Sequence, residues 1–295
     1  MAKPPPAPAV LSIQSQVVAG HVGNGAAQPA LQRLGFEVWA LPTIILSNHP
    51  GHGSFRGRAT DPALLADLLD GLDQGGWLSH CVGVLTGYLA TTGAAAVAED
   101  ALARVRAAHP GALVAVDPVM GDAPKGLYVA PDLVAVFRER LVPLADIVTP
   151  NRFELELLAG QPVASLASAL AAARILQAGT GSGPGPDIVL CTSFDRGHDA
   201  ADVVETLAVD RSGAWIARAP RLENVPNGAG DLMASLFLAA RLKGAAVPEA
   251  LGQAASATWR VLAASVAMGA DELALVPALD SLLGSVADAE VQQVA

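Results

Sequence analysis

The sequence is poor in aromatic, charged and cysteine residues, and each shortage excludes a class of protein. Aromatic residues make up 4% and charged residues 16% of the 295 positions, whereas hydrophobic residues make up 52%. With so many apolar side chains available for a core, the chain is not expected to be disordered. No apolar run reaches the ~18 uninterrupted residues that a membrane-spanning helix needs, so no membrane partner is expected.

Basic residues are also scarce. The chain has 18 lysines and arginines against 28 aspartates and glutamates, which gives a net charge of −10. An acidic surface repels phosphate backbones and anionic lipid, so nucleic acid is not expected as a partner. A nucleotide could bind only where local donors or a metal ion override this charge. The composition therefore favours a focused site over a basic surface patch.

The two cysteines, Cys81 and Cys191, each adjoin an apolar run. We expect them to be buried, reduced thiols rather than a disulfide or metal ligands. Residues 1–9 are rich in proline and lack the apolar segment of a signal peptide, so an extended tail is expected there. Together these features predict a cytoplasmic protein.

Short apolar runs alternate with helical patterns along most of the chain. Strands are expected at residues 10–13, 38–41, 82–85, 113–116, 146–148 and 188–191, and helices at 26–34, 62–72, 93–108, 131–141, 228–242 and 247–267. Strands that are apolar on both faces, alternating with helices, predict an α/β fold with a mostly parallel sheet covered on both sides. Residues 203–219 contain a turn between two strand-like runs and predict an antiparallel hairpin at a sheet edge.

The pattern predicts one domain over residues 10–290. Residues 43–60 are rich in Gly, His and Ser and are expected to form a lid or an edge hairpin. The glycine-rich residues 179–186 could suggest a phosphate loop, but such a loop should lead into a helix. Prolines and then a strand follow here, so a flexible connector is expected.

The segment Gly228-Ala229-Gly230-Asp231 directly precedes an apolar helical run. Glycines allow the backbone to approach an anion closely, and a helix start offers unpaired N–H groups. Asp231 would lie in the first turn, where a carboxylate can take a proton from a substrate hydroxyl. An ordinary helix start with a favourable charge explains the same residues equally well.

Polar residues also follow two neighbouring strands. Asp117 and Asp122 come after the strand at 113–116, and Thr149, Asn151 and Glu154 come after the strand at 146–148. Loops at the carboxyl ends of parallel strands form the ligand crevice of open α/β sheets. Carboxylates there could hold a hydrated Mg²⁺ beside nucleotide phosphates, although each could also serve only as a helix cap. Taken with the glycine-rich helix start, they favour a site of phosphoryl transfer.

The Gly-Ala-Gly-Asp helix start resembles the anion-hole signature of the ribokinase-like superfamily. Further motifs, in order along the chain, resemble those of pyridoxal kinases: residues 12–24, 36–38, 46–49, 85–88, 117–122 and 149–151. The resemblance spans about residues 10–270. It implies a ribokinase-like three-layer α/β/α fold with a small lid, and a homodimer that phosphorylates the 5′-hydroxyl of pyridoxal.

The resemblance also implies roles for individual residues. Asp231 would be the general base, and Gly228, Ala229 and Gly230 the anion hole. The substrate pocket would be formed by Ser15, Val22, His49, Pro50, Tyr88 and Asp231. ATP would be bound by Asp117, Thr149, Asn151, Glu154, Thr192, Ser193, Pro220, Arg221 and Leu222. Mg²⁺ would lie near Asp117, Asp122, Thr149 and Glu154, and a monovalent cation (K⁺ or Na⁺) near Asp122 and Thr149.

The chain departs from the family pattern at three positions of the site. Ala229 stands where threonine is frequent, Ile45 replaces a polar residue, and Pro50 replaces a threonine that lines the pyridoxal site. These changes keep open a kinase for hydroxymethylpyrimidine or another small alcohol, and a pyridoxal-binding protein without catalysis. A nicotinamide dehydrogenase is disfavoured, because residues 20–25 lack the glycine spacing of a dinucleotide loop.

Two other residue types carry weaker signals. His49 and His52 lie three positions apart, but no further ligands at zinc spacing accompany them, so metal ligation by histidine is not expected. The four tryptophans, Trp39, Trp77, Trp215 and Trp259, show no spacing typical of a base-stacking platform and are expected to pack in the core or at its edges.

Overall fold

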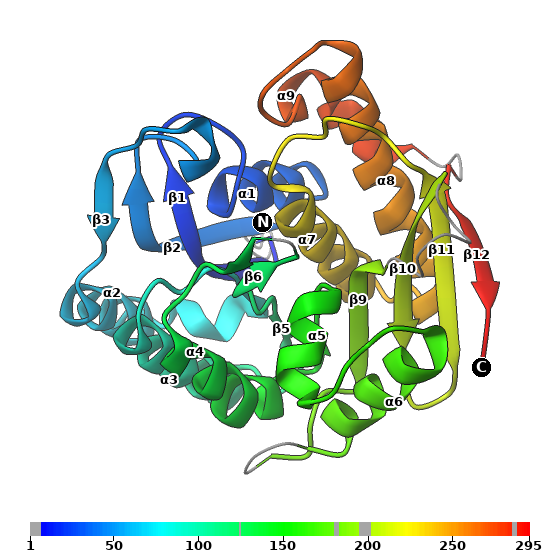
Figure 1. Cartoon of the computed structure of the whole chain (residues 1–295). Helices are drawn as coiled ribbons and strands as arrows, with labels where there is room; N and C mark the ends of the chain where they lie inside the picture. The colour runs from blue at the N-terminus through cyan, green and yellow to red at the C-terminus, as the bar shows by residue number, and fades with distance from the viewer. Residues whose placement is uncertain (1–6, 124, 180–182, 195–201, 285–287) are drawn as a thin grey trace, which may run out of the picture.

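The computed structural model describes residues 7–123, 125–179, 183–194, 202–284 and 288–295. In this part of the chain, one ten-stranded sheet has the order β12-β11-β10-β9-β8-β5-β4-β1-β2-β3 (Figure 1). Its strands are β1 (Ala9–Val17), β2 (Glu37–Leu46), β3 (Gly57–Ala59), β4 (Cys81–Thr86), β5 (Leu113–Val116), β8 (Ile147–Val148), β9 (Ile188–Phe194), β10 (Val203–Val209), β11 (Ala214–Pro220) and β12 (Glu290–Gln293). A separate small hairpin joins β6 (Gly121–Asp122) to β7 (Gly126–Leu127).

The six strands from β2 to β9 in this order are mutually parallel, and the strands at the two edges are antiparallel. β1 pairs with β2 on one side and with β4 on the other. The strand order therefore reverses at β1, because the following strand, β2, lies on one side of β1 and the later strand β4 lies on the other. In open α/β sheets, ligands bind in the crevice beyond the carboxyl ends of the strands at such a switch point.

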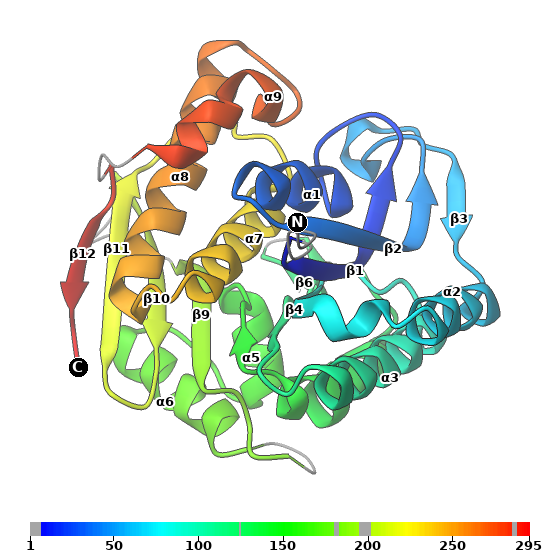
Figure 2. The same ribbon diagram turned by 180° about the vertical axis from the view of Figure 1, so that it is seen from behind.

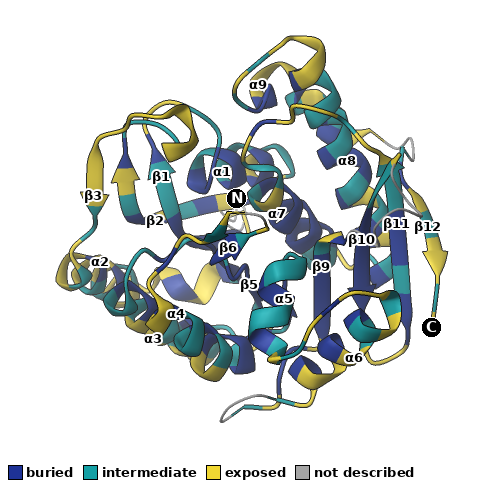
Figure 3. Ribbon diagram, viewed as in Figure 1, coloured by how far each residue is buried: buried dark blue, intermediate teal, exposed yellow. Residues whose placement is uncertain are grey.

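Helices cover both faces of the sheet, as Figures 1 and 2 show from opposite sides. One face carries α2 (Pro62–Gln74), α3 (Thr92–Ala108), α4 (Pro131–Val136), α5 (Arg152–Ala159) and α6 (Leu166–Gln177). The other carries α1 (Asn24–Arg33), α7 (Ala229–Leu242), α8 (Val247–Ala267) and α9 (Leu275–Ala278). Figure 3 shows the central strands buried between these layers and the edge strands β3 and β12 more exposed. The predicted three-layer α/β/α fold is confirmed.

Local sequence signals explain where several helices begin. Asp61 caps α2 ahead of Pro62, and the Thr91 side chain accepts the Ala94 N–H at the start of α3. The helix predicted at residues 131–141 is α-helical only to Val136 and continues as a π-helical turn, Phe137–Leu141. The predicted hairpin is present as β10 and β11. Residues 43–60 include the end of β2 and its antiparallel partner β3, which matches the edge-hairpin alternative.

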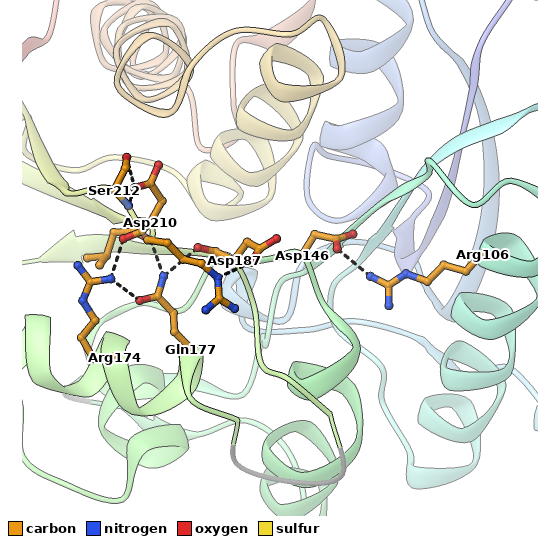
Figure 4. Close-up of polar contacts among 9 residues, drawn as sticks. Arg106, Asp146, Arg174, Gln177, Asp187, Asp210 and Ser212 are labelled. Atoms are coloured by element: carbon orange, nitrogen blue, oxygen red, sulfur yellow. Dashed lines mark hydrogen bonds and ion pairs between the residues drawn. The ribbon is translucent and has the colours of Figure 1, made fainter.

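A polar network joins elements at the amino ends of the parallel strands (Figure 4). Asp146, just before β8, accepts the Val114 N–H at 2.7 Å and pairs with Arg106 of α3 at 2.9 Å. Gln177 of α6 donates to the carbonyl oxygens of Asp187 and Val209. These bonds satisfy backbone groups at strand ends. They lie at the amino ends of the parallel strands, whereas the loops that carry the predicted site residues lie at the carboxyl ends.

Candidate active site

The loop between β1 and α1 crosses the switch point of the sheet. The Gly23 residue that caps α1 lies against Ser15, since a Cβ placed on it would come within 2.3 Å of Ser15 Oγ. Tyr88 follows β4, the neighbour of β1, and its carbonyl oxygen accepts the Thr43 hydroxyl at 2.5 Å. The predicted substrate residues Ser15 and Tyr88 thus lie near the carboxyl ends of the neighbouring strands β1 and β4, and Val22 of the loop after β1 is buried.

Asp231 lies in the first turn of α7 and contacts the β1–α1 loop. Its Oδ2 accepts the Gly23 N–H at 2.9 Å, a contact between residues 208 positions apart. Burial raises the pKa of the Asp231 carboxyl to about 6, and the Gly23 hydrogen bond opposes this by favouring the charged form. A carboxylate with such a pKa is ionised at neutral pH and is still basic enough to accept a proton.

The two glycines before Asp231 serve different purposes. Gly228 has φ 99°, and a Cβ there would approach the His21 carbonyl oxygen to 2.3 Å, so only glycine fits. At Gly230 a Cβ would meet no atom within 4 Å. Protein packing therefore does not require glycine at position 230, and its missing side chain leaves open space above the start of α7. This is where helix N–H groups can meet an anion.

Carboxyl groups from neighbouring loops influence one another beside this helix start. The carboxyl of Asp117 is buried, which raises its pKa well above the ordinary value, and the charges of Glu154 and Asp231 raise it further. Burial likewise raises the pKa of Glu154 to about 7, against three backbone hydrogen bonds, and the charge of Asp122 adds to the increase. The raised pKa values mean that ionisation of Asp117 and Glu154 is unfavourable, and a bound cation would favour the ionised form.

Glu154 has a clear structural role. Its Oε1 accepts the N–H groups of Met120 at 2.8 Å and Gly121 at 3.3 Å, and its Oε2 accepts that of Asn151 at 2.9 Å. In turn, Asn151 Oδ1 accepts the Glu154 N–H at 2.9 Å, which caps α5. Asn151 Nδ2 donates to the Gly121 carbonyl oxygen at 2.8 Å. The pair fastens the loop after β5 to the start of α5, so Glu154 takes part in capping this helix.

An open cleft of about 600 Å³ lies on the other side of the α7 start. It is bounded by the ends of β9 and β11, the starts of α5 and α7, and one side of α8. Ser193 lines it with φ 49°, a backbone conformation that residues other than glycine rarely adopt. The predicted site residues among its lining are Asp122, Asn151, Thr192, Ser193, Pro220, Arg221, Leu222, Ala229 and Gly230. The volume is typical of a site for a small molecule or cofactor.

The remaining predicted residues do not line this cleft. Asp117, Thr149 and Glu154 are buried behind it, and Ser15, Val22, Tyr88 and Gly228 belong to the β1 side of Asp231. His49 caps the short turn Pro50–His52, where its Nδ1 accepts the Gly51 N–H at 3.1 Å. Burial lowers the pKa of the His49 imidazole, although the nearby Glu272 charge opposes this. Asp231 therefore stands between two groups of predicted residues.

Oxygen ligands at this edge fit a hydrated divalent cation. Two buried oxygen atoms, Asp122 Oδ1 and Thr149 Oγ1, lack a well-formed hydrogen bond among the described residues, although Thr149 lies close enough to Asp117 to lower the pKa of its carboxyl, and Asp122 close enough to Tyr128 to raise the pKa of its hydroxyl. Within the same residues, no group of three or more His, Cys, Asp or Glu side chains forms a ready-made metal cage. Mg²⁺ is commonly held by one or two carboxylates, water and substrate phosphates, and this donor set is of that kind.

Comparisons with known proteins agree with this geometry. The model of the phosphomethylpyrimidine kinase family matches residues 79–275. The pyridoxal kinase PdxY of Deinococcus radiodurans is 48% identical to the chain over 271 residues, which are 91% of each protein. That of Rubrobacter xylanophilus is 45% identical over 288 residues, which are 97% of each protein. The chain belongs to the pyridoxal kinase family.

Solved pyridoxal kinases share the whole fold. The enzyme from Leishmania donovani in complex with ADP and pyridoxine is 30% identical, with a TM-score of 0.89 over 97% of this chain and 99% of that chain. The enzyme from Trypanosoma brucei is 29% identical, with a TM-score of 0.85 and the same coverage. The family resemblance noted from the sequence motifs is thereby confirmed, including its ribokinase-like architecture.

The sequence analysis did not assign to the site some residues that the structure of this pyridoxal kinase family member places near it. Trp259 of α8 is half-buried, in agreement with the expected edge packing, but it also lines the cleft and donates from Nε1 to the Pro220 carbonyl oxygen at 3.0 Å. Trp39 and Trp77 do pack edge-to-face, with their ring centroids 5.9 Å apart. Glu272, in the loop after α8, contacts both His21 and His52. Its only sequence signal is the acidic pair Asp271-Glu272 in an otherwise apolar stretch.

Both cysteines are free and buried, as expected. In the part of the chain that the structure describes, every helix is too short or too polar to cross a membrane. The extended tail predicted at residues 1–9 falls mostly outside the described residues, as does the middle of the connector at 179–186.

Proposed function

We propose that the protein transfers the γ-phosphoryl group of ATP to the 5′-hydroxyl of pyridoxal, or of the related vitamers pyridoxine and pyridoxamine. The observation that carries this proposal is the position of Asp231, which bonds to the β1–α1 loop and directly follows Ala229 and Gly230, two residues that line the 600 Å³ cleft. A base placed there can face an alcohol on one side and a nucleotide phosphate on the other. Membership of the pyridoxal kinase family supports the choice of alcohol.

In this proposal each side of Asp231 has its own task. The vitamer lies among Ser15, Val22, His49, Pro50 and Tyr88. Asp231 accepts the proton of the hydroxyl, which makes the oxygen a better nucleophile toward the terminal phosphorus. The backbone N–H groups of Gly228, Ala229 and Gly230 stabilise the charge that develops on the phosphoryl group in transfer.

The nucleotide occupies the cleft, with its phosphates toward α7. Thr192, Ser193 and Asn151 bind the phosphates, and Pro220, Arg221 and Leu222 border the adenosine. Asp117, Asp122, Thr149 and Glu154 would hold Mg²⁺ through water, and Asp122 and Thr149 would adjoin a monovalent cation (K⁺ or Na⁺). When bound, Mg²⁺ neutralises phosphate charge beside these carboxylates.

We also propose a single kinase domain over residues 10–290, a lid formed by residues 43–60, and a homodimer. The support for the dimer is an apolar surface beside the lid: Val18 is 81% exposed and Ile45 46% exposed. They lie close together, because the Val18 N–H donates to the carbonyl oxygen of Leu46. An Ile45→Asp variant should yield a monomer in sedimentation analysis. The free thiols agree with a reducing compartment such as the cytoplasm.

The proposal is tested by steady-state kinetics with MgATP and four acceptors: pyridoxal, pyridoxine, pyridoxamine and hydroxymethylpyrimidine. We expect the highest kcat/KM for a B6 vitamer, with ADP and the 5′-phosphate formed in equal amounts. Omission of Mg²⁺ should abolish the reaction. Binding of pyridoxal without ADP release would instead indicate a pyridoxal-binding protein, and would overturn the kinase proposal.

A second candidate is a hydroxymethylpyrimidine kinase. Two observations favour it: the match to the phosphomethylpyrimidine kinase model, and the loss of polar groups at Ile45 and Pro50. Ile45 is 46% exposed, which suits a surface position better than a polar contact to substrate. A higher kcat/KM for hydroxymethylpyrimidine than for every vitamer would decide for this candidate.

A further inference from the structure

Glu272, in the loop between α8 and α9, contacts two segments that lie more than 200 positions away in the sequence. Its Oε2 accepts the backbone N–H of His21 at 2.9 Å. Its Oε1 lies 3.3 Å from Nε2 of His52, with the two side chains 26% and 31% exposed. One carboxylate therefore joins the β1–α1 loop to the turn Pro50–His52.

The backbone around Glu272 leaves room for its carboxylate. A Cβ placed on Gly20 would lie 2.5 Å from Oε1 and 2.7 Å from Oε2 of Glu272. Any side chain at position 20 would therefore displace the carboxylate. The contact between Glu272 and the His21 N–H, as observed, therefore requires a residue without a side chain at position 20.

Each of the two segments carries a residue of the proposed site. His21 is two residues before Gly23, whose N–H donates to Oδ2 of Asp231 at 2.9 Å. His52 ends the turn that His49 begins, and the two imidazole rings lie 6.3 Å apart at an interplanar angle of 76°. Movement of either segment would shift a group that faces the vitamer.

We propose that Glu272 is a positioning residue that clips the lid turn and the β1–α1 loop together over the vitamer crevice. One arm, through the His21 N–H, holds the loop that orients the Asp231 carboxylate. The other arm, through His52, holds His49 and Pro50 against the crevice. The kinetic part of this inference rests on the proposed function, whereas the clip itself is a property of the fold.

The two arms make different kinetic predictions, because one supports the base and the other supports binding. Loss of the His52 arm should raise KM for pyridoxal about three- to tenfold, as expected for a partly exposed charge-assisted contact, and leave kcat nearly unchanged. Loss of both arms should also lower kcat, by about five- to tenfold, since a backbone N–H near the base is released.

Three variants separate the arms. His52→Ala removes one arm. Glu272→Gln keeps an oxygen that can accept the His21 N–H but lacks the charge that attracts His52. Glu272→Ala removes both arms. The matched control is Asp271→Asn, which removes the adjacent, exposed carboxylate. For each protein, kcat and KM for pyridoxal are measured together with hydrogen–deuterium exchange of peptides that cover residues 20–25 and 47–57.

We expect His52→Ala and Glu272→Gln to speed exchange only in residues 47–57 and to raise KM. Glu272→Ala should speed exchange in both segments and lower kcat as well, and Asp271→Asn should resemble the wild type. The clip is refuted if Glu272→Ala leaves exchange in both segments at the wild-type rate. If the wild type phosphorylates no vitamer, the exchange data still decide about the clip, and the proposed function alone has failed.

Discussion

Replacing Asp231 with asparagine should lower the activity of the protein while raising its stability. Asparagine has nearly the same size and keeps an oxygen that can accept the Gly23 N–H, which now bonds to Oδ2 of Asp231 at 2.9 Å. The substitution removes only the charge and the basicity. Because general-base catalysis typically contributes about 10²- to 10⁴-fold, we expect kcat to fall by that factor, with little change in nucleotide binding.

The stability effect follows from the pKa of Asp231, which burial raises from 3.8 to about 6. Below pH ~4 the group is protonated in both the folded and the unfolded protein and has no effect. Between about pH 4 and 6 the folded state keeps a proton that the unfolded state releases, so the ionisable group destabilises the fold progressively as pH rises. Above pH ~6 the cost is constant at about 2 to 3 kcal/mol, since each pH unit corresponds to about 1.4 kcal/mol.

The Asp231→Asn variant should therefore melt about 4–6 °C above the wild type at pH 7.5, at roughly 2 °C per kcal/mol for a chain of this size. At pH 4 the two proteins should melt at nearly the same temperature. Glu249→Gln is the control, because Glu249 is an exposed acid in the first turn of the neighbouring helix α8. A variant with near-normal kcat, or one that is less stable at pH 7.5, would refute the reasoning about Asp231.

Three further predictions follow from the same contacts. First, kcat/KM for pyridoxal should fall with decreasing pH below about 6, where Asp231 becomes protonated, and a profile that is flat between pH 5 and 7 would contradict this. Second, Gly230→Ala should not lower the melting temperature, because a Cβ at that position has no atom of another segment within 4 Å, but should lower kcat/KM for ATP by crowding the anion site; isothermal titration with ATP provides the check. Third, Glu154→Ala should destabilise the protein by about 2–4 kcal/mol in urea unfolding, since it leaves three N–H groups without their acceptor, two of them buried, whereas exposed Glu139→Ala should have little effect.

Much of the fold could be predicted from the sequence, because buried parallel strands leave short apolar runs with turn residues between them. The strand at Leu113–Val116 and the helix at Val247–Ala267 were predicted to the residue. α5 and α6 were not predicted. α5 has only eight residues directly after a polar loop, and α6 is largely alanine and leucine. β12 has a polar sequence and is defined only by its pairing with β11.

The acidic loops and the glycine-rich helix start could be predicted because they follow strands whose ends must meet at one edge. Contacts between residues far apart in the sequence could not be predicted in this way. The Gly23 N–H on Asp231, and Glu272 between His21 and His52, depend on the docking of α1, α7 and α8 on the sheet. Trp259 lies in a helix that is apolar around much of its surface, so spacing alone did not reveal that it faces the cleft.

A structure of the protein with Mg²⁺, a non-hydrolysable ATP analogue and pyridoxal tests the central claim most directly. We predict that an Asp231 carboxylate oxygen lies within hydrogen-bond distance, about 2.6–3.2 Å, of the 5′-hydroxyl oxygen. That hydroxyl oxygen should face the γ-phosphorus, with the phosphate oxygens at the N–H groups of residues 228–230. A complex in which pyridoxal binds with its 5′-hydroxyl beyond reach of Asp231, or in which the γ-phosphate lies away from the start of α7, would contradict the account.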